Sequence, residues 1–391
     1  MAALALLGGA IWWHWRQTHP ERPHPAAPLP ASIPKTQAPL EQPNPFGAAL
    51  SPSKAMANAG EKSVEVCGIG KVVWDTEGEL TTKGLEAKSE ENLARWQTSL
   101  LKSDDPRARA VGLLIDSRFN GPPAVESLVQ LTEETHDPVV YAIALNACTH
   151  HVASTLSDLQ PASCGQISAT GWTAIDSDNA AAWMTLASIA RSANDMIQEN
   201  EAFARAAKAT AFDGYNWSLF GFAEPEMPRD LNPLERYELS IYMVGIEAAM
   251  SSTHLTTASR HCSSDAIHDE GIRSQCDQVA DLLVTKGSTL LDLGIGTAIG
   301  ARVGWPKSRV AELTEQKEAF QQAERQQSEP DKGENFFSCA NAARRNLFLH
   351  EWAQLGELGA AHEIIDRSGE SISDLALKYR DFIYKLQHAS P

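Results

Sequence analysis

The chain has 391 residues, of which 43% are hydrophobic and 21% are charged, a composition typical of a folded protein with a buried core. Its formal net charge of -17 disfavours nucleic acid or an anionic lipid surface as the main partner, because such binding needs a basic face. Lys and Arg form no cluster larger than Arg344-Arg345, so we exclude nucleic acid as the principal ligand.

The residues after Met1 predict a short membrane anchor. Ala2 to Trp15 contains no charged residue and is followed by Arg16. As a helix it would span about 21 Å, less than the roughly 30 Å of the hydrocarbon core, but its tryptophans suit the membrane–water interface. We expect residues 1–18 to be an anchor or uncleaved signal. A cleaved signal peptide is the alternative, although no convincing cleavage site follows.

Proline dominates the next segment. It recurs throughout residues 20–52, where it fixes φ and removes backbone donors, so that neither a helix nor a sheet can form. We therefore expect residues 19–60 to be a disordered, semi-extended linker, and residues 61–391 to be the folded domain.

The folded part begins with a β-like segment and continues as helices. Val64 to Trp74 combines β-branched residues with two glycines and predicts a short strand or an extended N-terminal arm. From Ser89 onward, hydrophobic residues recur at helical spacing. The first such face consists of Leu93, Trp96, Leu100 and Leu101.

Helix start signals repeat along the chain. Asp105-Pro106, Asp137-Pro138 and Asp178-Asn179 each place a capping side chain before a helical pattern, at spacings of 32 and 41 residues. Asn232-Pro233 is a fourth such start. This spacing favours stacked helix pairs. Later helical patterns cover 273–303, 307–327, 336–355, 360–367 and 372–386.

One stretch resembles a known repeat. In residues 178–209 a tryptophan and small residues precede a turn, and alanines follow it: Trp183, Leu186, Ala187, Ala190, Ala202, Ala206 and Ala209. Asn194-Asp195 stands at the turn. The pattern resembles a tetratricopeptide repeat, with a weaker second match at residues 356–365. The resemblance implies a divergent α-solenoid of stacked helix pairs.

A second motif could carry chemistry. Leu290 to Gly300, LLDLGIGTAIG, is similar to the cofactor-binding motif of S-adenosylmethionine-dependent methyltransferases, which implies a strand, a glycine turn and a helix. The flanking residues keep a helical period, however, and no β/α alternation follows. We therefore expect a helix in which Gly294, Ala298 and Ala301 let a neighbour pack closely, and no bound cofactor.

Histidines gather loosely near two cysteines. They are His150 and His151 near Cys148, and His254, His261 and His268 near Cys262. Structural zinc sites normally have tightly paired ligands, which these spacings lack. We expect exposed loop histidines and no metal site.

No catalytic residue is predicted. The nucleophile signature G-x-S-x-G is absent, and paired carboxylates such as Glu133-Glu134 fall at a helix end where we expect them to be solvated. Seven tryptophans lie in or near helices and are expected to fill the spaces between helix pairs, although one or two could line a ligand groove. They are Trp74, Trp96, Trp172, Trp183, Trp217, Trp305 and Trp352.

The cysteine pattern predicts disulfides. The chain has six cysteines, an even number, and no C-x-x-C motif, which in an exported protein indicates disulfides. Six cysteines allow fifteen pairings. Cys148–Cys164 and Cys262–Cys276 each span one short interruption of the helical pattern, where an αα-hairpin brings its ends together. By elimination, Cys67–Cys339 would tie the arm to the C-terminal helices.

These observations predict an all-α fold: an α-solenoid of stacked helix pairs, similar to tetratricopeptide or HEAT repeats, with a short extended N-terminal arm. We expect it in the periplasm of a Gram-negative bacterium, anchored to the inner membrane. The expected function is non-catalytic binding of a protein or peptide partner. A cell-envelope enzyme is the alternative. A deep cleft with convergent carboxylates would favour the enzyme, and a broad groove would favour binding.

Overall fold

The computed structural model describes residues 63–73, 83–153, 161–215, 218–250, 253–329 and 335–388. The chain divides into two units, residues 1–64 with 73–80, and residues 65–72 with 81–391. The predicted anchor and linker, residues 1–18 and 19–60, lie outside the described residues. Within the described ranges, no helix is both long and apolar enough to cross a membrane.

The second unit is helical, as predicted, and begins with seven described helices that alternate with short connections. They are α2 (Lys83–Leu101), α3 (Pro106–Asn120), α4 (Pro122–Thr135), α5 (Pro138–Ala153), α6 (Ala169–Ile175), α7 (Ala180–Ser192) and α8 (Met196–Ala206), with a 3₁₀ turn at Ala162–Gln166. The predicted starts are confirmed. The side chains of Asp105, Asp137 and Asn179 each accept a hydrogen bond from the backbone N–H two residues later.

Eight more helices follow. They are α9 (Leu219–Ala223), α10 (Pro233–Ala249), α11 (Thr253–His261), α12 (Glu270–Lys286), α13 (Leu290–Val303), α14 (Lys307–Ser328), α15 (Cys339–Ser368) and α16 (Ile372–His388), with 3₁₀ turns at Glu224–Glu226 and Ala266–His268. As expected from its sequence, α10 starts at Asn232-Pro233, where the N-cap Asn232 forms a capping box with Glu235.

The continuous helical pattern predicted over 273–303 is wrong in one respect, because two helices share it. Gly287 ends α12 with an extended backbone, φ -63° and ψ 146°. Thr289 and Asp292 then form a capping box that starts α13. A hydrophobic period alone does not reveal this break, because both helices present apolar faces. The predicted helices 336–355 and 360–367 instead form α15, with non-helical backbone at Gly356.

The predicted β-like arm is a two-stranded sheet, β1 (Ser63–Val66) and β2 (Gly70–Val73). The backbone N–H of Cys67 donates to Phe337 O at 3.0 Å, so the arm meets the segment before α15. The disulfide between Cys67 and Cys339 joins the same two segments covalently.

Three disulfides cross-link the second unit, and they are the three predicted pairs, two of them predicted from the spacing and Cys67–Cys339 by elimination. Their Cα–Cα separations are 4.7 Å for Cys67–Cys339, 5.6 Å for Cys148–Cys164 and 5.7 Å for Cys262–Cys276. The two local bridges link α5 to the following 3₁₀ turn, and the residue after α11 to α12. Because such bonds persist in oxidising compartments, they indicate an extracytoplasmic location.

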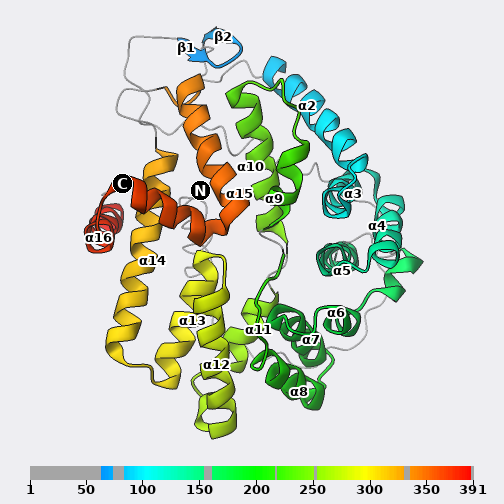
Figure 1. The fold of residues 1–391 in the computed structure, drawn as a ribbon, viewed down its shortest axis with the longest axis vertical. Helices are drawn as coiled ribbons and strands as arrows, with labels where there is room; N and C mark the ends of the chain where they lie inside the picture. The colour runs from blue at the N-terminus through cyan, green and yellow to red at the C-terminus, as the bar shows by residue number, and fades with distance from the viewer. Residues whose placement is uncertain are drawn as a thin grey trace, which may run out of the picture. The chain divides into compact units, whose positions relative to one another are not determined.

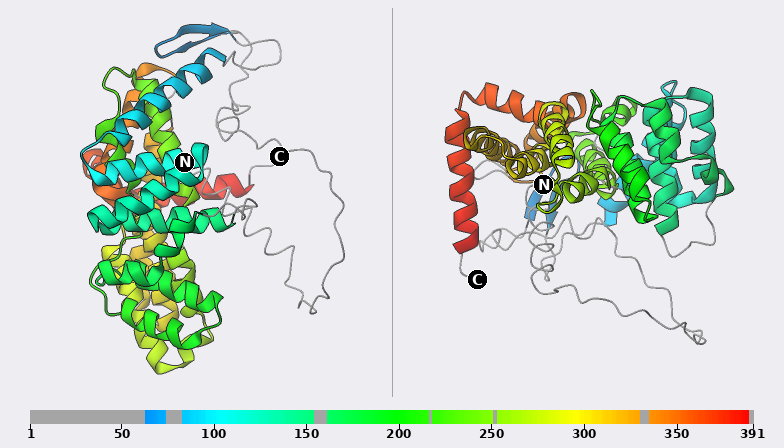
Figure 2. Two further views of the ribbon diagram at one scale, coloured as in Figure 1. Left: turned by 90° about the vertical axis from the view of Figure 1, so that its right-hand side faces the viewer. Right: turned by 90° about the horizontal axis from the view of Figure 1, so that it is seen from below.

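Consecutive helices pack against one another along much of the second unit, as in the pairs α3–α4, α7–α8 and α12–α13 (Figure 1). The helices α9 and α10 lie between the first helices of the unit and α15. They contact α3 and α2, respectively, and both contact α15. Figure 2 shows α16, in red, alongside α14. The packing thus includes contacts beyond the nearest-neighbour ones of a linear repeat array.

Tryptophans fill spaces between helices, as predicted for the described ones. Trp96 is fully buried, and its indole N–H donates to Ala223 O at 3.0 Å, which ties α2 to the end of α9. Trp172 and Trp352 are also buried, whereas Trp183 and Trp305 are half-buried against the core. Leu101 departs from the predicted apolar face of α2 and is 37% exposed. Trp74 and Trp217 lie outside the described residues.

The Cys262–Cys276 bridge gives a test of stability. Both cysteines are fully buried, and the bond closes a loop of 14 residues. We expect the double substitution Cys262→Ala/Cys276→Ala to lower the free energy of unfolding by about 3 kcal/mol, because the unfolded chain regains the entropy of that loop. Denaturant unfolding of both proteins would measure the difference. Peptide mapping without reduction that finds Cys262 joined to another cysteine would contradict the pairing.

Candidate functional site

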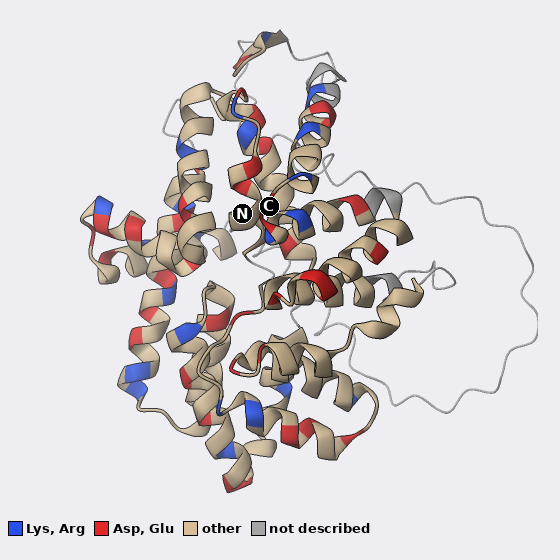
Figure 3. Ribbon diagram, turned by 45° about the vertical axis from the view of Figure 1, so that its right-hand side comes forward, with Lys and Arg blue, Asp and Glu red and all other residues tan. Residues whose placement is uncertain are grey.

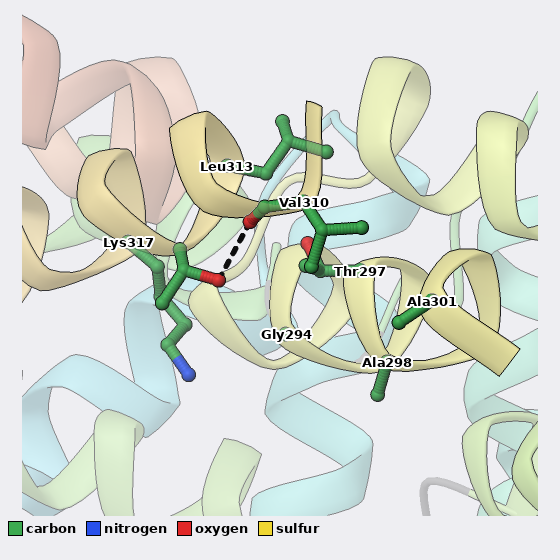
Figure 4. Close-up of a pocket in the computed structure, with 8 residues that line it drawn as sticks. Gly294, Thr297, Ala298, Ala301, Val310, Leu313 and Lys317 are labelled. Atoms are coloured by element: carbon green, nitrogen blue, oxygen red, sulfur yellow. Dashed lines mark hydrogen bonds between the residues drawn. The ribbon is translucent and has the colours of Figure 1, made fainter. Parts of the chain in front are cut away.

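A groove between α13 and α14 is the candidate site of the second unit. Its volume is about 210 Å³. Four residues of each helix line it (Figure 4): Gly294, Thr297, Ala298 and Ala301 from α13, and Val310, Leu313, Thr314 and Lys317 from α14. The small residues of α13 leave the space, because none of them carries a side chain long enough to reach across to α14.

The walls of the groove are apolar or internally satisfied. The Thr297 hydroxyl donates to Leu293 O and the Thr314 hydroxyl to Val310 O, both at 2.7 Å and both within their own helix. These hydroxyl protons are therefore engaged. The groove offers a ligand mainly van der Waals surface and the one charged group on its lining, Lys317.

Lys317 lies beside the least bulky residue of the groove. A Cβ placed on Gly294 would meet Lys317 Cδ at 3.6 Å and Nζ at 3.9 Å, so the lysine uses the space that glycine leaves. No Asp or Glu of the described residues forms an ion pair with this ammonium group. Acidic and basic residues are otherwise spread over the helices (Figure 3), and the whole chain carries a net charge of -17. An unpaired cation at this place can attract an anionic group.

An exposed leucine of α13 lies one turn before the groove. Leu291 precedes Gly294 by three residues, and such neighbours share a helix face. Leu291 is 46% exposed. Exposed apolar surface beside a groove marks a place where another molecule can bury area.

The motif 290–300 is helical, as predicted, and its acidic residue has a structural role. Asp292 Oδ2 accepts hydrogen bonds from the backbone N–H groups of Ser288 at 3.1 Å and Thr289 at 3.0 Å. Burial raises the pKa of Asp292 to about 6, against these hydrogen bonds, which lower it. The carboxyl group thus caps the start of α13.

The glycines of this motif serve helix packing. A Cβ on Gly296 would lie 2.9 Å from the Cβ of Leu283 on α12, and a Cβ on Gly300 would collide with the Trp305 ring. Both contacts are tighter than side chains allow, so the glycines let α12 and Trp305 approach α13. Close packing was predicted at other residues, Gly294, Ala298 and Ala301, and these line the groove instead.

The expectation of exposed loop histidines is wrong for two of them. His254 and His261 lie in α11 and are 4% and 5% exposed. His254 meets the ring of Phe212 edge-on, and burial lowers its pKa to about 4. The helix turns both rings toward the core, a placement that loop-like sequence spacing does not reveal. His268 is exposed, as expected, and His150 and His151 belong to the last turn of α5.

His261 belongs to a buried polar group that the sequence analysis missed. Its ring stacks on Phe203 at 3.8 Å, and its Nδ1 lies 3.5 Å from Oε1 of the fully buried Glu199. Arg191 also donates to that oxygen, at 2.7 Å. Burial lowers the pKa of His261, so the imidazole is neutral at neutral pH. The group ties α7, α8 and α11 together.

Carboxyl groups lie both at the surface and in the core of the described structure. Glu133 and Glu134 are exposed at the end of α4, as expected. Among the described residues no three His, Cys, Asp or Glu side chains gather as a metal site. Buried carboxyls occur elsewhere, on α10, and at the start of α13, where α14 and α15 contribute Glu324 and Glu357. The sequence does not reveal these buried carboxyl groups, because each is a single acidic residue in a helix.

Glu247 on α10 gives a test of the buried carboxyls. Its Oε1 accepts a hydrogen bond from Phe220 N at 2.8 Å, and burial raises its pKa to about 8. Because this value lies above the ordinary 4.5, the folded protein holds the proton more tightly than the unfolded chain does. The stabilisation is complete below about pH 4.5 and is lost as the pH rises toward 8.

We expect Glu247→Gln to flatten this pH dependence, because the amide keeps an acceptor for Phe220 and cannot ionise. The fall in the free energy of unfolding between pH 5 and pH 8 should shrink by on the order of a few kcal/mol. Urea unfolding across that range would measure it, with Glu312→Gln, an exposed site on α14, as control. An unchanged slope in Glu247→Gln would refute the assignment.

No protein-family model, curated protein or solved structure matches this chain. The resemblance of residues 178–209 to a tetratricopeptide repeat stays a prediction from the residues, with the helix pair α7–α8 as its structural counterpart. Function is therefore inferred from the geometry of the second unit.

Proposed function

We propose that the chain is a periplasmic scaffold of a Gram-negative bacterium, tethered to the inner membrane by residues 1–18, whose helical domain binds a protein or peptide partner and catalyses no reaction. Three disulfides support an oxidising location. The predicted anchor and proline-rich linker support the tether.

The observation that carries the binding function is the groove between α13 and α14. It combines apolar walls with the ammonium group of Lys317, for which the described residues provide no ion-pair partner. The exposed Leu291 lies on the same face of α13 as Gly294. Helical segments of partner proteins dock in such grooves by burying apolar side chains. The partner proposed here is a segment with apolar side chains and one acidic residue, which would pair with Lys317.

The fold interpretation is part of the same proposal. The pair α7–α8, with α5, α6 and α11 around it, supports a divergent α-solenoid of tetratricopeptide-like helix pairs. The contacts of α9 and α10 with both α2–α3 and α15 would close that array on itself.

The groove also supports binding over the alternative of a cell-envelope enzyme. Its lining includes a lysine and two threonines whose hydroxyl protons are engaged, but no carboxylate, histidine or cysteine. General acid–base catalysis most often uses a histidine or a carboxyl group within hydrogen-bond reach of the substrate.

A photo-crosslinking residue in place of Ala298 should capture the partner in living cells. Ala298 is exposed and lines the groove. We expect one discrete crosslinked product, with a yield about tenfold lower when Lys317→Glu is added, because the charge reversal repels the acidic partner. Gel electrophoresis and mass spectrometry would measure the yield and identify the product.

Two matched variants control this experiment. Lys307→Glu changes the same charge on α14 outside the groove and should leave the yield unchanged. The crosslinker at Glu201, exposed on α8, should give no such product. A product that forms equally from Glu201, or that survives Lys317→Glu at full yield, would exclude the groove as the binding surface.

The location has a separate test. A reporter that is active only in the cytoplasm, fused after Pro391, should stay silent, because the proposed topology exports the helical domain. Deleting residues 1–18 from the same fusion should restore activity. Activity of the full-length fusion would contradict the periplasmic location.

A further inference from the structure

Three helices meet where α13 begins. The backbone N–H of Leu290, the first residue of α13, donates to Glu357 Oε2 at 2.7 Å. Leu358 N donates to Ser288 O at 3.1 Å, so that α15 is also bonded to the segment that precedes α13. Figure 1 shows the start of α13 beneath the bend of α15. The C-terminal half of α14 contributes Glu324 to this junction.

The carboxyl groups of Glu324 and Glu357 hydrogen-bond each other. Two carboxyl groups can do so only when one of them carries a proton, because two carboxylates have acceptors and no donor. Glu324 Oε1 is buried, and among the described residues no N–H or O–H donor reaches it. Glu357 already accepts from Leu290, which favours its charged form. Glu324 is therefore the proton carrier and Glu357 the acceptor.

The groups around the pair are acidic or neutral. Asp292 on α13 faces Glu357, Asp213 lies near Asp292, and Tyr379 on α16 lies near Glu324. The nearby cation on α14, Arg325, is engaged by Glu329 and the Phe382 ring. His362 on α15 meets Phe320 edge-on, and Lys286 at the end of α12 is exposed. Within the described chain, no Lys, Arg or His forms an ion pair with Glu324, Glu357 or Asp292.

The helix that carries Glu357 is already broken beside it. Gly356 has φ 73° and ψ 171°, non-helical values inside α15 that favour glycine. Gly356 thus marks a kink between the two halves of α15. The second half is held by the bonds of Glu357 and Leu358 to the start of α13 and by its buried side chains, among them Ala360 and Ile364.

We propose that this junction is a proton-operated latch: the proton shared by Glu324 and Glu357 holds α14, the start of α13 and the second half of α15 together, and its loss releases α15 at Gly356. Loss of the proton leaves two carboxylates side by side with Asp292 in a poorly solvated place. Like charges at contact distance repel strongly there. Gly356 is the hinge at which the backbone can change direction.

Burial sets the pH at which the latch acts. It raises the pKa of Glu357 to about 7 and holds the pKa of Glu324 well above its ordinary value, with the neighbouring carboxylate adding to the shift of Glu324. Because both folded-state values lie above the ordinary ones, the closed latch is favoured at low pH and loses stability as the pH rises. The latch is closed at pH 6, below the pKa of Glu357, and opens as the pH rises past the raised pKa of Glu324.

The latch also concerns the groove, because α13 and α14 form both. Opening at Leu290 and Glu324 would change the spacing of the two groove walls. The effect on the groove rests on the proposed function, whereas the latch itself does not. Hydrogen exchange of the protein without a partner tests the latch alone.

Hydrogen exchange of the full chain at pH 6 and pH 8.5, corrected for the intrinsic rate at each pH, tests the latch. We expect peptides that contain Leu290 and Leu358 to lose at least about tenfold in protection at pH 8.5, since their amides are the bonds that open. Peptides of α7, far from the junction in the sequence, should keep theirs. Equal protection at the two pH values would overturn the proposal.

Substitutions of Glu324 and Glu357 test whether their shared proton causes the pH dependence. Glu324→Gln supplies a permanent N–H donor to Glu357, so protection at Leu290 and Leu358 should become independent of pH and stay high. Glu357→Gln keeps an acceptor for Leu290 and should likewise remove the loss of protection at pH 8.5. This second variant tests the proposal if Glu324→Gln fails to fold. Glu312→Gln, exposed on the same helix, should behave as the parent does. Persistent pH dependence in a folded Glu324→Gln or Glu357→Gln protein would show that the shared proton is not the switch.

Discussion

The second half of the structure depends on how the chain turns between α12 and α13. Gly287 leaves the helical conformation, and Asp292 then accepts the backbone N–H groups of Ser288 and Thr289, which fixes the start of α13. Gly296 allows α13 to fold back closely on α12. This placement gives α14 its neighbour, leaves the groove between them, and presents the N–H of Leu290 to α15. One capped turn therefore positions both the proposed binding surface and the latch.

The disulfides and the helix contacts connect residues at different separations along the chain. Two disulfides close loops of 16 and 14 residues and fix local helix connections, whereas Cys67–Cys339 spans 272 residues. In the chain-entropy model, the longest loop removes the most freedom from the unfolded chain, roughly 5 kcal/mol or more. The contacts of α9 and α10 with both early and late helices act at similar range. Both kinds of contact make the end of the chain depend on its beginning.

Buried acids give this domain a consistent response to pH. Burial raises the pKa of Asp292, Glu247 and Glu357 to values between about 6 and 8, and raises that of Glu324 as well. Each of them stabilises the folded state most below its ordinary pKa, and this stabilisation is lost as the pH rises through the raised value. His254 opposes this trend at lower pH, because its pKa of about 4 means that folding holds it neutral. Stability should therefore be greatest on the mildly acidic side of neutrality.

Local signals in the sequence determined the helical class, the capped starts at Asp105, Asp137 and Asn232, and the two short-range cysteine pairs, because caps and short disulfide loops involve residues close along the chain. The long-range pair Cys67–Cys339 followed only by elimination. The break at Gly287 was hidden, since a hydrophobic period passes through it unchanged. Only the tertiary structure decided that Gly294 and Ala298 face a groove, that His261 is buried against Phe203, and that Glu324 meets Glu357 across two helices. Each of these depends on which helices become neighbours, and that choice is made by packing over the whole domain.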